Sequence, residues 1–84
     1  MVSETKAIET INKYLTCAQE SNIHQYLPVV ASQIRNDSQL CECLIDFLGN
    51  IYVYAGLDEN YEENACGSEI QEAINFLSFC NGQV

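Results

Sequence analysis

An acidic segment in the second half of the chain holds the side chains best suited to specific contacts. Six of the twelve acidic residues lie between positions 58 and 72, with a tyrosine among them. Closely spaced carboxylates can imitate backbone phosphates toward a groove lined with Lys and Arg, and the attraction speeds association. An aromatic anchor supplies contact energy that charge alone does not. The candidate partner-binding residues are therefore Asp58, Glu59, Tyr61, Glu62, Glu63, Glu69 and Glu72.

The cysteines and the histidine are poorly arranged for metal binding or catalysis. Cys41 and Cys43 are two positions apart, so on a helix they point about 200° from one another. There is no CxxC pair, and His24 is the only histidine. A Cys–His nucleophile would also need positive charge to stabilise the thiolate, and the chain has three Lys and Arg in total. We expect no catalytic residue, no metal, no cofactor and no enzymatic activity.

The formal charge of −9 restricts the kind of partner. Such a surface repels nucleic-acid phosphates and anionic membranes, so we expect no direct binding to either and instead a protein partner with a basic surface. A competing explanation is that acidity only keeps a small protein in solution. The five cysteines are odd in number and the N-terminus has no apolar signal stretch, so we expect a cytoplasmic protein with free thiols.

The acidic segment must be positioned by a small helical fold. With 84 residues, of which 48% are apolar and 18% charged, the chain has the composition of one folded domain over residues 1–84. Its most apolar stretch spans 40–57, where apolar residues three and four apart predict a helix that is buried around most of its girth. We expect an all-α fold, a small bundle of about four helices packed around this central third helix.

Two helical segments are predicted before the central helix. The first runs from about Glu4 to Glu20, with Ser3 as its cap and an apolar stripe on one side. A break follows at residues 21–22. The apolar period continues through Pro28, which cannot lie unperturbed inside a helix. This predicts a turn at 23–26 and a helix at 28–36, or one kinked helix.

The central helix is predicted to begin after a cap at Asp37-Ser38 and to end at Ala55. Gly56 would then terminate it in the left-handed conformation. Residues 51–54 also have high β propensity, so a strand there is the alternative. No second run of this kind exists to pair with such a strand, and we therefore favour continuation of the helix.

The acidic connector at 58–67 is predicted to hold at most one helical turn, with Asp58 as its cap and Gly67 as its stop. Ser68 and Gln71 then have the spacing of a capping box, in which each side chain accepts a hydrogen bond from the backbone N–H of the other residue. They predict a last helix that extends to about Cys80 and is ended by residues 81–82.

These observations favour two functional hypotheses. The more specific is a small acidic inhibitor or nucleic-acid mimic that acts on a nucleic-acid-binding protein, of the type encoded by phages and mobile elements. The alternative is a helical adaptor or self-associating module in which acidity is incidental. Val53 and Phe79 lie on otherwise polar sides of their helices, so they are the candidate residues for a homodimer.

Overall fold

The computed structural model describes residues 4–18 and 25–82, and these residues form four helices. The helices are α1 (Glu4–Cys17), α2 (Ala31–Asn36), α3 (Ser38–Ala55) and α4 (Ala65–Asn81). No strand occurs within the described ranges, so the prediction of an all-α bundle is confirmed. None of the described helices combines the length and apolar character needed to cross a membrane.

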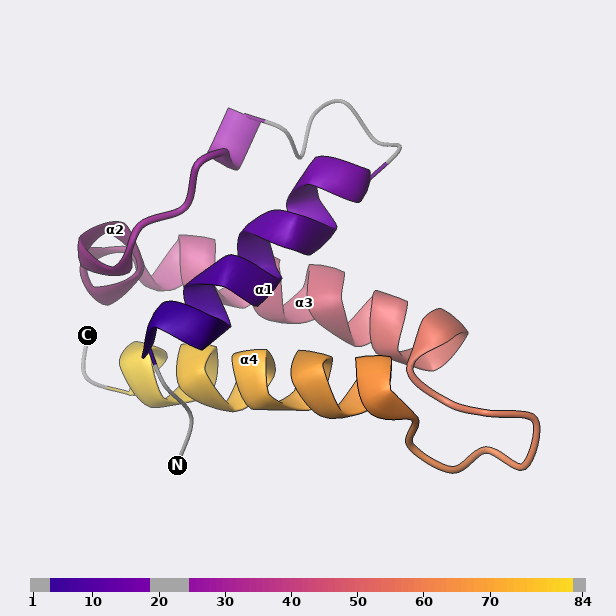
Figure 1. Cartoon of the computed structure of the whole chain (residues 1–84). Helices are drawn as coiled ribbons and strands as arrows, with labels where there is room; N and C mark the ends of the chain where they lie inside the picture. The colour runs from indigo at the N-terminus through magenta and orange to yellow at the C-terminus, as the bar shows by residue number, and fades with distance from the viewer. Residues whose placement is uncertain (1–3, 19–24, 83–84) are drawn as a thin grey trace.

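The core lies between a pair of long helices and the two that cover them. In Figure 1, α3 and α4 run antiparallel side by side, α1 crosses one face of the pair at an angle, and α2 lies near the start of α3. The predicted central position of the third helix is confirmed, although α4 shares it because α4 contacts all three other helices. The largest fully buried side chains include Ile11, Leu15, Ile34, Leu44, Leu48, Ile70 and Leu77.

Helix α1 is shorter than its apolar stripe predicts. Its buried side chains recur at the predicted spacing, as at Ala7, Ile11 and Leu15. The helix ends at Cys17 instead of Glu20, and the N–H of Ala18 bonds the carbonyl of Leu15 in a tighter turn. The predicted cap at Ser3 and the predicted break at 21–22 lie outside the described residues.

The segment before α2 is extended where a helix was predicted. Residues 25–26 form a short helical turn, as expected, but α2 begins at Ala31 and not at Pro28. The reason is a tertiary contact: the Asn12 side chain donates to the carbonyl of Val29 at 3.0 Å and accepts from its N–H at 2.8 Å. These bonds satisfy the backbone of a buried residue without a helix.

Helix α3 begins and ends where the sequence predicts. The side chain of Asp37 accepts from the N–H of Leu40 at 3.0 Å, which confirms the cap, and the helix continues through residues 51–54 to Ala55. The predicted left-handed terminator is wrong, because Gly56 has φ −90 and ψ −3. Its lack of a side chain serves a close approach to α4, described with the site below.

Helix α4 begins four residues earlier than its predicted capping box implies. The N-cap is Asn64, whose side chain accepts from the N–H of Gly67 at 2.8 Å. Ser68 therefore lies inside the helix, and Gln71 bonds Asn75 instead of completing a box. Gly67, predicted to stop a turn, is a buried residue of the first helical turn. The helix ends at Asn81, close to the prediction.

Candidate partner-binding site

The base of the α3–α4 loop, residues 57–64, is held by two glycines in backbone contact. A Cβ atom built on Gly67 would lie only 2.1 Å from the carbonyl oxygen of Gly56, so neither position has room for a larger residue. The N–H of Asn64 donates to the same Gly56 carbonyl, and the Asn64 amide donates to the carbonyl of Ala55. The end of α3 and the start of α4 are thereby joined into one unit.

The tip of the loop is a turn built on one carboxylate. The Asp58 side chain accepts from the N–H groups of Asn60 at 2.8 Å and Glu62 at 3.0 Å. The backbone of Asp58 also bonds Tyr61 and Glu62. Asp58 thus caps a turn, although not the helical turn that was predicted. Its carboxylate faces its own backbone, so it contributes charge to the site more than a direct contact.

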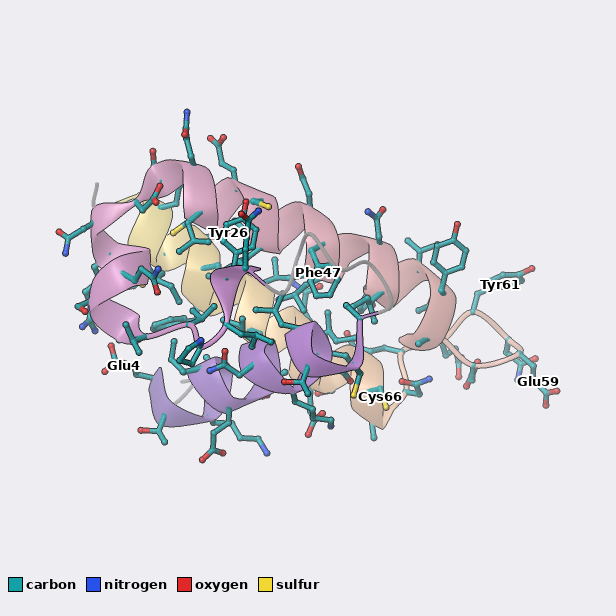
Figure 2. All side chains as sticks on the ribbon, turned by 90° about the horizontal axis from the view of Figure 1, so that it is seen from above. Glu4, Tyr26, Phe47, Glu59, Tyr61 and Cys66 are labelled. Atoms are coloured by element: carbon teal, nitrogen blue, oxygen red, sulfur yellow. The ribbon has the colours of Figure 1, made fainter. Side chains whose placement is uncertain are left out.

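Tyr61 is the most unusual residue of the loop. Its φ is 62, the one positive value among the described residues other than glycine, and a side chain rarely adopts this left-handed conformation. The surrounding turn directs the ring outward, and 84% of the residue is exposed. Figure 2 shows Tyr61 and Glu59 projecting from the loop at the opposite end of the molecule from Glu4.

The predicted acidic residues of the loop are exposed but differ in their contacts. Glu59 and Glu62 are exposed, and neither carboxylate has a hydrogen bond or ion pair with any described residue. Glu63 accepts from the phenol of Tyr52 at 3.1 Å, on the last turns of α3. Partial burial and this carboxylate together raise the pKa of Tyr52. Glu59 and Glu62 are therefore the carboxylates most available to a partner.

The two candidate partner-binding residues on α4 lie outside the group of loop carboxylates. Glu69 faces α1, where it lies 3.1 Å from the ammonium of Lys13 and 3.7 Å from that of Lys6. The hydrogen bond from Lys13 lowers the pKa of Glu69, and the same bond raises the pKa of Lys13. Glu72 is exposed on α4, one turn beyond Glu69. The structure thus separates the seven candidate residues into five on the loop and two on α4.

The loop at residues 57–64 contains no Lys or Arg. All three Lys and Arg residues precede position 36 in the sequence. In the structure, Lys6 and Lys13 pair with Glu69, and Arg35 of α2 pairs with Glu4 of α1. None of these three ion pairs among the described residues involves a loop carboxylate.

The two candidate self-association residues are exposed but lie far apart. Val53 and Phe79 are each 65% exposed. Val53 lies in the last turn of α3 and Phe79 in the last turn of α4, and these helices run antiparallel (Figure 1). The two side chains are therefore at opposite ends of the pair and do not form one patch.

Sequence reasoning missed one exposed aromatic residue near the loop. Tyr54 lies in the apolar stretch 40–57, which predicts a helix buried around most of its girth, yet 89% of the residue is exposed. The signal that could have found it is its spacing, because Tyr54 follows the exposed Asn50 by four positions and so shares its side of the helix. The last turn of α3 therefore presents two large side chains to solvent, Val53 and Tyr54.

The thiols are divided between the core and the surface, and all five are free in the structure. Cys41 and Cys80 are buried, and burial raises the pKa of both thiols, which suits a structural role. Cys17 and Cys66 are exposed, and Cys43 is half-buried. Across residues 4–18 and 25–82, no group of three or more His, Cys, Asp or Glu side chains could hold a metal ion. His24 lies outside the described residues.

No protein family, curated protein or solved structure matches this chain.

Proposed function

We propose that this is a non-enzymatic binding protein that docks on the basic surface of a partner protein through the loop at residues 57–64. The observation that carries the proposal is an exposed tyrosine between two free carboxylates. Tyr61 projects from the loop tip, and Glu59 and Glu62 on either side of it have no described partner. An interface needs both features, because charge accelerates encounter while a buried aromatic ring slows dissociation.

The partner we propose is a nucleic-acid-binding protein, which this protein would inhibit as a mimic of its ligand. A groove that binds nucleic acid is lined with Lys and Arg that neutralise closely spaced phosphates. The loop offers closely spaced carboxylates that form no ion pair with the described Lys and Arg side chains, on a base formed by Gly56 and Gly67. Occupying such a groove would exclude nucleic acid from it, a mode of action suited to phage or mobile-element inhibitors.

The test is capture of a partner from the native host, followed by kinetics with a charge-deleted variant. In the variant, Glu59, Glu62 and Glu63 are replaced by Gln, which retains an oxygen able to accept the Tyr52 hydrogen bond. A matched control removes three exposed charges elsewhere, through Glu9→Gln, Glu42→Gln and Asp46→Asn. We expect the loop variant to associate about tenfold more slowly, with a weaker salt dependence.

The control decides whether the position of the charges matters. The control variant should keep most of the association rate, because its lost charges lie outside the loop. If both variants bind the captured partner as the parent does at physiological salt, the proposal is wrong. If both lose the same fraction of the rate, net charge alone attracts the partner and the loop is not the site.

One observation supports the alternative of an apolar adaptor. Phe79 is exposed in the last turn of α4, and residues 73–82 include no charged side chain. A contact through this region would be insensitive to salt. A complex that survives high salt during elution would therefore favour the adaptor over the acidic inhibitor.

A further inference from the structure

The last turn of α3 is an exposed apolar face directly beside the loop. Val53 and Tyr54 are exposed there. They lie three and two residues before Gly56, which contacts Gly67. Because the carbonyls of Ala55 and Gly56 are both bonded to Asn64, this turn and the loop base move together. Single exposed apolar residues are common on protein surfaces. Here three large exposed residues occur within nine positions at one end of the bundle, namely Val53, Tyr54 and Tyr61.

The charge around this face favours a cation as its ligand. The last turn of α3 contains no basic residue. The loop that follows adds the free carboxylates of Glu59 and Glu62. An occupant must therefore bring positive charge together with a surface that packs on tyrosine rings.

We infer that Val53, Tyr54 and Tyr61 form the contact surface for an arginine-bearing segment of the partner protein. A guanidinium is planar, stacks on aromatic rings and can bond a carboxylate with two N–H groups at once. A lysine ammonium is also attracted to an aromatic ring, but it cannot stack flat on the ring or bond a carboxylate with two parallel N–H groups. The inference rests on the proposed function and adds to it the α3 face and the preference for arginine over lysine.

The test compares two fluorescent peptides, one alternating arginine with serine and one alternating lysine with serine at the same length. Binding to the full chain is measured by anisotropy at physiological salt. The lysine peptide keeps the cation–π attraction but loses the flat stacking and the paired carboxylate bonds, so the arginine peptide should bind about threefold more tightly.

Single substitutions then assign the preference to its residues. Tyr54→Ser and Tyr61→Ser should each reduce the preference for arginine, whereas Val53→Ser should weaken both peptides by packing loss. The matched control is Phe79→Ser, which removes a side chain with the same 65% exposure as Val53 at the other end of the helix pair. It should leave both affinities unchanged.

The outcomes separate this inference from the proposed function. Any of three results would reject the inferred arginine-binding surface. The two peptides could bind with equal affinity, neither peptide could bind, or the tyrosine variants could behave like Phe79→Ser. The proposed function would survive that result if the glutamine variant of the loop still associates slowly with the captured partner. The reverse result, a preference for arginine with no effect of the loop glutamines, would reject the acidic loop as the docking site.

Discussion

Two connections between helices, the described part of the α1–α2 connection at residues 25–30 and the α3–α4 loop at residues 57–64, are held in place by different partners. The first depends on the core: Val29 is buried, and both of its backbone polar groups bond the side chain of Asn12 in α1. The second depends on itself and on the two helix ends that it joins. Asp58 accepts from the loop backbone, and Asn64 bonds the end of α3.

The difference shows how one connection can be structural and the other available for binding. In the first, the side chain that fixes the backbone also lies in the bundle. In the second, the bonds that shape the loop run within the loop, so the ring of Tyr61 and the carboxylates of Glu59 and Glu62 remain free. A loop of this kind, on a rigid base, is where binding residues are commonly found. Three substitutions can test this comparison.

The largest effect is expected from breaking the base of the second connection with Gly67→Ala. The new Cβ would lie 2.1 Å from the carbonyl oxygen of Gly56, so the helix ends must separate. We expect a loss of about 3 kcal/mol in the free energy of unfolding, measured by urea denaturation with circular dichroism. Gly49→Ala is the matched control, because a Cβ there has nothing within 4 Å. It should stabilise α3 by about 1 kcal/mol, and equal stability of the two variants would show that the glycine contact is dispensable.

A smaller loss is expected from releasing the first connection with Asn12→Ala. The substitution leaves the N–H and the carbonyl of buried Val29 without their partner. An unsatisfied buried polar group costs about 1–3 kcal/mol, and we expect about 2 kcal/mol here in the same assay. Asn50→Ala, at an exposed site on α3, should change stability by less than about 0.5 kcal/mol. A loss for Asn12→Ala no larger than this would mean that the connection does not depend on the core.

The smallest effect, a gain, is expected at the loop tip from Tyr61→Gly. The left-handed conformation costs a side chain about 1–2 kcal/mol, and glycine adopts it freely. The greater freedom of glycine in the unfolded chain offsets part of this, so we expect a gain of about 0.5 kcal/mol by thermal denaturation. Tyr61→Ala removes the same ring but keeps the strain, and it should give no gain. If Tyr61→Gly destabilises the protein, the ring contributes to folding and is not free for a partner.

The long helices were predictable because their signals are local and agree with one another. In α3 the spacing of Leu40, Leu44 and Leu48, together with the cap at Asp37, predicted both the helix and its buried side. The helix also continues through residues 51–54 despite their β propensity, because tertiary packing can override local propensity. The acidic segment and the exposure of Val53 and Phe79 were likewise readable from residue types and helical spacing.

What the sequence could not decide depended on contacts between residues far apart in the chain. Asn64 and Ser68 are both good helix caps, and the packing of Gly67 on Gly56 favours the earlier one. Asn12 reaches Val29 across 17 positions and keeps it out of a helix. Lys13 bonds Glu69, 56 positions away in the sequence, so the Glu69 carboxylate is not free to bind a partner. Local propensity determined which segments are helical, whereas the tertiary structure decided where two of them begin and which acidic side chains remain free, because both depend on which surfaces meet.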